Sequence, residues 1–381
     1  MEVKQTLVHN PYRKVNFNTY TRHLCNLHCH TTYSDGYKEP HVRVDEYHDA
    51  GFTILAITDH DTSHKNYPRT LYPWTDFELI WDEVRDGVSK TWPTSGTGGW
   101  VTDNNNRGDG NDWENRDPEA LGMLAIEATE LTAALGTLPR REDLTAFDCG
   151  IPAQATTLFA TATNVENAGG WSVLVHPGRS TAEFTPAYIL NLKQNHMDSL
   201  MAMDVFDRRS DQPFWQNRWD EVNRNLPWDK PLYGMGSDDA HYSEQLFEGY
   251  NQVFLPELTK EAFVDAVQNG AYGFSDQWIK GNKFGPGNWL STTAGQMENP
   301  APFITRISRG ADAIRVDALN ADSYSWQDDS GNEIATGNEV SIRGLTHKFV
   351  RCLIDNATGT TATQPFGLKE ENVEEDALFM L

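Results

Sequence analysis

The sequence lacks long apolar segments and is poor in cysteine. No run of about 18 apolar residues occurs, and residues 1–20 are polar, without the apolar stretch of a secretion signal. The four cysteines, Cys25, Cys29, Cys149 and Cys352, show no C-x-x-C spacing, which argues against a zinc ribbon or a disulfide scaffold. We therefore expect a protein without membrane spans that lies in the cytoplasm. A secreted form whose leader has been removed is the alternative.

Positive charge is also scarce. The chain has 31 Lys and Arg against 55 Asp and Glu, which gives a formal net charge of -24. Such a field repels phosphate backbones and anionic membranes, so neither nucleic acid nor a membrane is an expected partner. A small anionic substrate can still bind where metal ions cancel the field locally. The charge therefore favours a small-molecule substrate at a metal site, and it leaves the oligomeric state open.

The 381 residues are enough for one large domain and one small domain. Between residues 27 and 271, short apolar runs alternate with helical patterns, as in β/α units around a parallel sheet. The expected strands are 53–58, 123–127 continuing towards 132, 171–175, 200–205 and 232–236. The expected helices are 40–50, 185–194, 215–226 and 259–268. This alternation predicts a barrel-like α/β domain over residues 1–290.

Two regions depart from this alternation. Residues 66–121 contain several Trp, many Asp and Asn, and a Gly-rich run, so they indicate a long insertion that is either a lid or a peripheral excursion. A Gly-, Pro-, Thr- and Asn-rich linker over 285–302 precedes a group of short expected strands. These strands are 303–308, 313–318, 339–343, 348–355 and 361–368. They predict a small all-β sandwich over residues 301–381.

The first motif with chemical content is a pair of histidines. His28 and His30 stand two apart in an expected strand or at its end, so their imidazoles share one face while Cys29 points away. Taken alone, this spacing also fits two half-exposed surface histidines. Asp35 adds a carboxylate in a tight turn, where Gly36 permits the backbone to fold over the site.

Later motifs follow the ends of expected strands, where the catalytic residues of α/β barrels gather. These motifs are Asp59-His60-Asp61, Glu127 with Glu130, His176-Pro177-Gly178-Arg179 and Asp238-Asp239-Ala240-His241. Imidazoles combined with carboxylates suit zinc, manganese or iron far better than calcium or magnesium. The spacing therefore predicts a transition-metal site.

The order H-x-H-x-x-x-S-D-G, T-D-H-D, small-x-Glu-hydrophobic-Thr, H-P-G-R and D-D-A-H resembles the PHP (polymerase and histidinol phosphatase) superfamily over residues 22–280. The C-terminal segment also looks like the small β domain of the carbaryl-hydrolase-like branch. The resemblance implies a distorted (β/α)7 TIM-like barrel with two or three divalent zinc, manganese or iron ions. In this family the metals activate a water for attack on an ester, most often a phosphoester.

The resemblance also implies which residues of this chain bind metal. One metal would be held by His28, His30, Glu130 and Asp239, a second by bridging Glu130 with His176, and a third by Asp35, His60 and His241. The family's pattern selects Glu130 over Glu127, which becomes a neighbouring carboxylate.

In one place the chain departs from the family, which has a Gly-His pair between the glutamate and the His-Pro motif. No histidine lies between Leu131 and Val175, and Asp143 occupies the corresponding slot. Either Asp143 replaces that histidine, or the second metal is weak or absent.

Two further side chains are candidates for substrate contact. Arg179 offers a planar cation for a phosphoryl oxygen, with a structural salt bridge as the alternative. His64 would contact the substrate or leaving group, unless it belongs to a solvated loop. The leading hypothesis is a phosphoesterase acting on a mono- or diester. The alternatives are a carbamate, amide or carboxylic ester hydrolase with the same metals, and a non-catalytic metal-containing binding protein.

Overall fold

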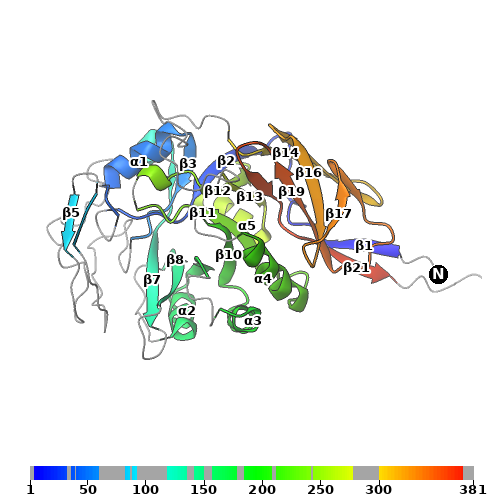
Figure 1. Ribbon diagram of the computed structural model, residues 1–381, viewed down its shortest axis with the longest axis horizontal. Helices are drawn as coiled ribbons and strands as arrows, with labels where there is room; N and C mark the ends of the chain where they lie inside the picture. The colour runs from blue at the N-terminus through cyan, green and yellow to red at the C-terminus, as the bar shows by residue number, and fades with distance from the viewer. Residues whose placement is uncertain are drawn as a thin grey trace, which may run out of the picture.

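A computed structural model gives the three-dimensional structure of the protein (Figure 1). It describes residues 4–31, 36–38, 40–59, 82–85, 88–91, 118–134, 141–149, 157–177, 184–207, 212–241, 243–277 and 300–371. Most of the expected insertion and the expected linker lie outside these ranges, so the lid interpretation stays a prediction. Of the insertion, the structure describes a two-stranded pair, β4 (Asp82–Arg85) with β5 (Val88–Thr91), and a 3-10 turn, Glu119–Leu121.

Two sheets form the body of the protein. In the first sheet, three parallel strands are followed by two strands that each run antiparallel to the strand before them. In the second sheet, the first three strands are likewise parallel, and the last two each run antiparallel to the strand before them. This part of the first sheet contains β6 (Leu124–Ala125), β3 (Phe52–Leu55), β2 (Thr21–Asn26), β12 (Gly249–Leu255) and β13 (Tyr272–Asp276). The second contains β11 (Tyr233–Ser237), β10 (Leu200–Asp207), β9 (Trp171–Leu174), β8 (Arg141–Phe147) and β7 (Ala128–Ala134).

The two sheets meet where their parallel strands end. On one side, the His30 N–H donates to the Ala240 carbonyl at 2.8 Å, and the Asp239 N–H donates to the His28 carbonyl at 3.0 Å. On the other, the Glu130 N–H donates to the Thr58 carbonyl at 3.2 Å. The α/β class is therefore confirmed. The described strands form separate sheets rather than one closed ladder, so the seven-unit barrel stays a prediction.

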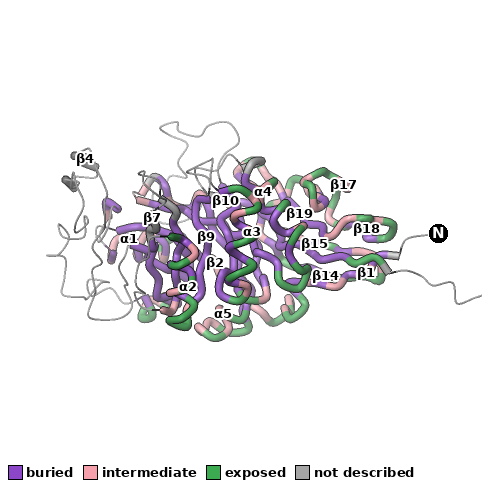
Figure 2. The backbone as a smooth tube through the Cα atoms, turned by 90° about the horizontal axis from the view of Figure 1, so that it is seen from below, coloured by how far each residue is buried: buried purple, intermediate pink, exposed green. Residues whose placement is uncertain are grey.

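Among the described residues, five α-helices cover the sheets: α1 (Pro40–Asp49), α2 (Leu158–Asn167), α3 (Pro186–Asn195), α4 (Gln212–Asn225) and α5 (Lys260–Asn269). Threonine caps start three of them, because the side chains of Thr157, Thr185 and Thr259 accept hydrogen bonds from backbone N–H groups in the first turn. Helix α2 was not expected from the sequence. No helix in the described part of the chain is long and apolar enough to cross a membrane. In Figure 2, the buried segments run through the central strands, and exposed segments lie on the helices.

The C-terminal strands form two layers. One is a three-stranded sheet of β14 (Phe303–Arg309), β15 (Ala313–Leu319) and β18 (Glu339–Ser341). The other contains β16 (Ser323–Asp328), β17 (Glu333–Thr336), β19 (Phe349–Asp355), β20 (Thr360–Ala362) and β21 (Phe366–Glu371). Ile314 and Val316 from the first layer share a buried cluster with Trp326 and Val350 from the second. Strands β16 and β17 were not expected from the sequence.

These strands are not separate from the main sheet. β20 pairs with β13 as well as with β19, so hydrogen bonding runs from β2 to the C-terminal layer without a break. The first strand, β1 (Lys4–His9), pairs with the last, β21, and the two lie side by side in Figure 1. The predicted domain boundary, between residues 290 and 301, therefore separates strands that belong to one continuous sheet. The division of the chain into two independent domains stays a prediction.

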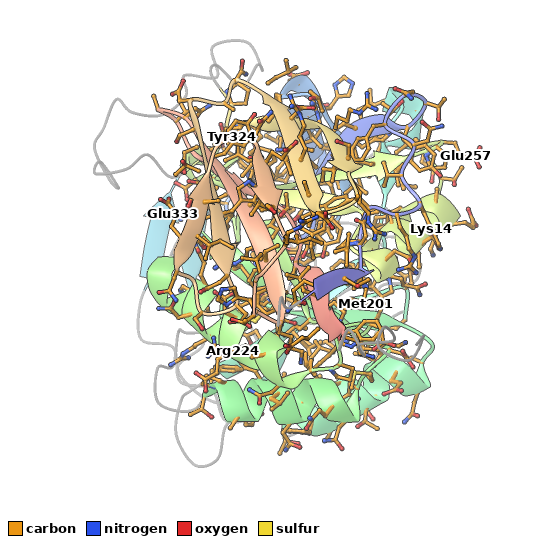
Figure 3. All side chains as sticks on the ribbon, turned by 90° about the vertical axis from the view of Figure 1, so that its right-hand side faces the viewer. Lys14, Met201, Arg224, Glu257, Tyr324 and Glu333 are labelled. Atoms are coloured by element: carbon orange, nitrogen blue, oxygen red, sulfur yellow. The ribbon has the colours of Figure 1, made fainter. Side chains whose placement is uncertain are left out.

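A buried ion pair joins α4 to β19. The Arg351 guanidinium donates to both carboxylate oxygens of Asp220, at 3.1 and 2.7 Å, and both side chains are almost completely buried. The guanidinium carbon also lies 5.4 Å from the ring centroid of Trp219. At the end of the same helix, Arg224 donates to the Asp329 carbonyl; Figure 3 views the molecule from the side that carries Arg224, Tyr324 and Glu333. These contacts hold the C-terminal strands against the α/β body.

We expect Arg351→Met to lower the free energy of unfolding by about 3–5 kcal/mol, because it leaves the Asp220 carboxylate buried and unpaired. Burial already raises the pKa of Asp220, and Arg351 opposes that rise. Without Arg351, the Asp220 carboxylate of the folded protein takes up a proton more readily. The loss in the free energy of unfolding should therefore be smaller at pH 5 than at pH 8. Denaturant unfolding measures both values. A double variant, Arg351→Met with Asp220→Asn, should lose less, and equal losses would contradict this account.

Candidate metal centre

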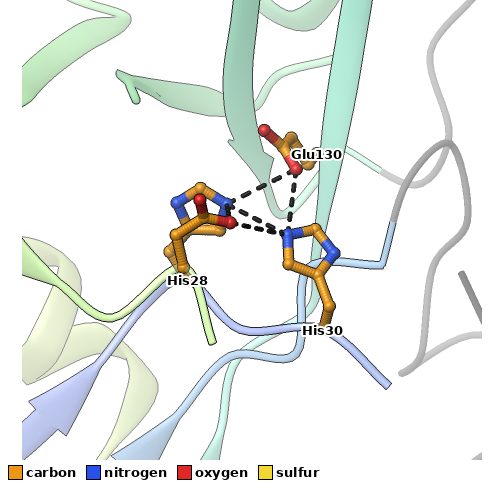
Figure 4. Close-up of side chains that lie close together, drawn as sticks. His28, His30 and Glu130 are labelled. Atoms are coloured by element: carbon orange, nitrogen blue, oxygen red, sulfur yellow. Dashed lines mark hydrogen bonds and ion pairs between the residues drawn. The ribbon is translucent and has the colours of Figure 1, made fainter. Parts of the chain in front are cut away.

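Four side chains converge where the two sheets meet. His28 and His30 follow β2, Glu130 lies on β7 and Asp239 follows β11. Nε2 of His28 and Nε2 of His30 are 3.3 Å apart, and each faces the same two carboxylate oxygens (Figure 4). Glu130 Oε2 lies 3.4 and 3.1 Å from these two nitrogens, and Asp239 Oδ1 lies 3.5 and 3.3 Å from them. All four side chains are at most 1% exposed. The two imidazoles face one side, as their spacing predicts.

The spacing of these atoms fits a metal ion. Zinc binds imidazole nitrogen and carboxylate oxygen at about 2.0–2.2 Å, and a tetrahedron with such bonds has edges of about 3.3–3.6 Å. The five distances given above lie between 3.1 and 3.5 Å. The four donors are therefore arranged as the ligands of one small divalent cation.

The electrostatics of the cluster also favour a cation. Burial disfavours a charged imidazole, yet the carboxylates of Glu130, Asp204 and Asp239 outweigh that effect and raise the pKa of His28 well above its usual value. The pocket therefore attracts positive charge, which either protons or a metal ion can supply.

A second cluster shares Glu130 with the first. Its other oxygen, Oε1, lies 2.8 Å from Nε2 of His176, and Asp143 Oδ2 lies 3.9 Å from the same nitrogen. One ligand atom from each of these three buried residues lies within 4.8 Å of the others. Asp143 is placed by β8, whose antiparallel pairing sets it opposite Thr132 of β7. The structure thus puts Asp143 beside His176, in the slot where the sequence lacks a histidine.

His241 lies at the edge of the first cluster. Its Nδ1 donates to the backbone carbonyl of Asp239 at 2.9 Å, which leaves Nε2 of the neutral ring with the lone pair. Its ring stacks on that of His30, with centroids 4.4 Å apart.

Four expected site residues lie outside the described residues: Asp35, His60, His64 and Arg179. The third subsite and the substrate contacts therefore stay predictions. Glu127 belongs to neither of the two clusters found among the described residues.

The backbone is strained at two of the converging residues. His176 and Asp239 have φ angles of +30° and +45°, which side-chain-bearing residues rarely adopt. Such conformations cost about 1–3 kcal/mol and persist where the surroundings enforce them, often at functional sites. Gly36 packs so closely that a Cβ there would lie 2.4 Å from the carbonyl carbon of His30. The expected role of Gly36, to let the backbone fold over the site, agrees with this contact.

Buried acids outside the clusters position the residues within them. Asp59 accepts hydrogen bonds from both the N–H and the hydroxyl of Thr31, at 2.7 and 2.5 Å, next to His30. Asp238, next to Asp239, accepts a hydrogen bond from the Tyr47 hydroxyl at 2.6 Å, and burial raises its pKa to about 6. These contacts fix the two chain segments that carry cluster residues.

Asp204 is a site residue that the sequence analysis missed. Its Oδ2 accepts hydrogen bonds from the Ser237 hydroxyl at 2.7 Å and from the His176 N–H at 3.2 Å, and it lies 3.8 Å from Nδ1 of His28. It therefore stands behind one histidine of each cluster. The only signal in the sequence is an aspartate inside the apolar run Met201-Ala202-Met203-Asp204-Val205 of β10.

Zinc or manganese should raise the melting temperature of chelator-treated protein. A cation at a concentration of 100 times its dissociation constant adds about 2.7 kcal/mol to the free energy of unfolding if it binds only the folded state. Scanning calorimetry with and without metal measures the shift. Glu130→Gln weakens both clusters, so an equal shift in that variant would show that the cation binds elsewhere.

Asp204→Asn should weaken metal binding about 10- to 100-fold, because carboxylates behind ligating histidines orient them and raise their basicity. The asparagine oxygen can still accept from Ser237 and from the His176 N–H, so the fold should persist. Competition with a chromophoric chelator measures the affinity. Ser237→Ala is the matched control, and a similar loss in that variant would assign the effect to packing.

Comparison with known proteins gives matches in structure only. No protein-family model matches the chain, and no curated protein matches it in sequence. A two-domain protein from Bacteroides vulgatus, containing a predicted PHP-like metal-dependent phosphoesterase, matches with a TM-score of 0.50 and 16% identity, over 95% of this chain and 91% of that one.

Two other solved structures match at a TM-score of 0.36. A putative metal-dependent phosphoesterase from Bifidobacterium adolescentis is 14% identical over 57% of this chain and 87% of its own. A lesion-specific endonuclease from Pyrococcus furiosus is 11% identical over 66% of this chain and 56% of its own. The carbaryl-hydrolase-like branch stays a prediction. The first of the three matches confirms the recognition from sequence motifs at the level of architecture: this chain has a PHP-like fold.

Proposed function

We propose that this chain is a metal-dependent hydrolase of the PHP type that cleaves an ester, in the first instance a phosphomonoester or phosphodiester. The observation that carries the proposal is the position of Glu130. One of its oxygens faces His28 and His30, and the other faces His176, so a single buried carboxylate serves two clusters. Shared carboxylates of this kind are a common way to hold two cations next to each other.

The charge of the site supports two cations. Four buried carboxylates, those of Glu130, Asp143, Asp204 and Asp239, surround imidazoles that are neutral when they bind metal. Two divalent cations would balance four negative charges. In the proposed assignment, His28, His30, Glu130 and Asp239 hold one cation, Glu130, Asp143 and His176 hold the second, and Asp35, His60 and His241 hold a third.

Cations bound at these residues would lower the pKa of a water and neutralise charge that develops on the ester oxygens. The residues of the chain would hold and orient these cations, and no side-chain nucleophile is needed. Ser237 lies two residues before Asp239, and its hydroxyl donates to Asp204, which gives it a structural role instead. The strained backbone at His176 and Asp239 would keep the ligands in place before substrate binds.

Phosphate recognition rests on Arg179, which follows His176 by three positions, and His64 would contact the leaving group. If Arg179 does not face the site, a carbamate, amide or carboxylic ester becomes the better substrate. The same proposal includes a distorted seven-unit barrel over residues 1–290 and a β sandwich over 301–381. It also includes zinc, manganese or iron as the metals, a small-molecule substrate rather than nucleic acid, and a location of the protein in the cytoplasm.

The test is hydrolysis of p-nitrophenyl phosphate and bis-p-nitrophenyl phosphate by the full chain, with metal content determined by mass spectrometry. We expect at least two equivalents of transition metal per chain and turnover that a chelator abolishes. Glu130→Gln should lower kcat by at least about a hundredfold, because it disturbs both clusters.

Three other outcomes separate the alternatives. Bound metal without phosphate release, but with chelator-sensitive cleavage of p-nitrophenyl acetate or a carbamate, would replace the phosphoesterase with the ester or carbamate hydrolase. Bound metal without turnover on any of these substrates would favour a binding protein. Absence of bound metal after loading would refute the metal centre itself.

A further inference from the structure

We propose that the two clusters are selective for different cations. The subsite of His28, His30, Glu130 and Asp239 takes a nitrogen-preferring cation of the zinc class, and the subsite of Glu130, Asp143 and His176 takes a harder, oxygen-preferring cation of the manganese class. This inference rests on the proposed function, because it concerns the metals of the same site. It adds a chemical difference between the two positions.

The donor sets differ in composition. The first subsite offers two imidazole nitrogens and two carboxylate oxygens, and the second offers one imidazole nitrogen and two carboxylate oxygens. Imidazole favours zinc, whereas carboxylate and water oxygens suit manganese and magnesium. Asp143 makes this difference, because an imidazole in its place would give the second subsite two nitrogen donors as well.

The donor spacing differs as well. In the first subsite the donors lie 3.1–3.5 Å apart, close to the edges of a tetrahedron around a zinc ion. In the second, Nε2 of His176 lies 2.8 Å from Glu130 Oε1 and 3.9 Å from Asp143 Oδ2. Three donors at uneven spacing leave positions that several waters can fill, as the octahedral, oxygen-rich coordination of manganese requires.

Burial makes the Asp143 carboxylate a real ligand candidate. Asp143 is only 2% exposed and lies on β8, a strand held on one side by β7 and on the other by β9. The Asp143 carboxylate lies 3.9 Å from Nε2 of His176, the nitrogen that Glu130 Oε1 also approaches. The pairing of β8 on both sides also fixes the direction of the Asp143 side chain. A neighbouring residue therefore cannot easily replace Asp143 as a ligand.

The experiment uses the full chain, stripped with a chelator and then given one equivalent of zinc. Manganese is titrated in, and the six-line electron paramagnetic resonance signal of free manganese reports how much remains unbound. Zinc is then added to displace the bound manganese, which gives the ratio of the two affinities at the second subsite. None of these readouts depends on catalytic activity.

We expect the wild-type chain with one zinc to bind one further manganese. Asp143→Asn should weaken this manganese binding by about tenfold or more without changing the affinity for the first zinc. Asp143→His should raise the zinc-to-manganese affinity ratio at the second subsite by about tenfold or more. Asp148→Asn is the matched control, because Asp148 follows the same strand but pairs with Lys260 and belongs to neither cluster.

Two results would overturn the inference. If the wild-type chain and Asp143→His show the same zinc-to-manganese ratio at the second subsite, Asp143 does not set the metal preference. If Asp143→Asn binds manganese as tightly as the wild-type chain, Asp143 is not a ligand. In both cases a chain with two bound metals keeps the proposed function, whereas a chain that binds no metal at all loses both.

Discussion

Negative charge buried between two sheets is the constraint on which the site depends. Glu130, Asp143, Asp204 and Asp239 lie within a region that excludes solvent, and the groups that face them are mainly imidazoles. Carboxylates in such surroundings are costly unless positive charge joins them. The raised pKa of His28 expresses the same demand for positive charge. An interior arranged in this way could hold a cation.

The fold meets this constraint by bringing strand ends together. His28 and His30 leave the first sheet where Asp239 and Ala240 leave the second, and backbone hydrogen bonds between these segments join the two. Outside the clusters, Asp59 accepts a hydrogen bond from Thr31 and Asp238 accepts one from Tyr47. Asp204 contacts one histidine of each cluster, because it accepts from the His176 N–H and lies 3.8 Å from Nδ1 of His28. Positive φ angles at His176 and Asp239 show that the surroundings override local backbone preference at these positions.

The C-terminal strands extend this framework. β20 continues the main sheet beyond β13, and β1 closes against β21, so both ends of the described chain are anchored in one continuous sheet. The Arg351–Asp220 pair then fixes β19 to α4, and α4 packs on β10, the strand that carries Asp204. Contacts therefore run from the C-terminal strands through α4 and β10 to Asp204, which accepts a hydrogen bond from the His176 N–H.

Local patterns in the sequence were enough to predict the α/β class, the common face of His28 and His30, and most helices to within a few residues. Each depends on spacing within a short stretch, where the two-residue period of a strand or the 3.6-residue period of a helix fixes side-chain direction. Only the tertiary structure could show that Glu130 faces two clusters, that Asp143 lies beside His176, that Asp204 supports both, and that β1 pairs with β21. These contacts join residues far apart in the chain, and they depend on strand order and register, which no local period encodes.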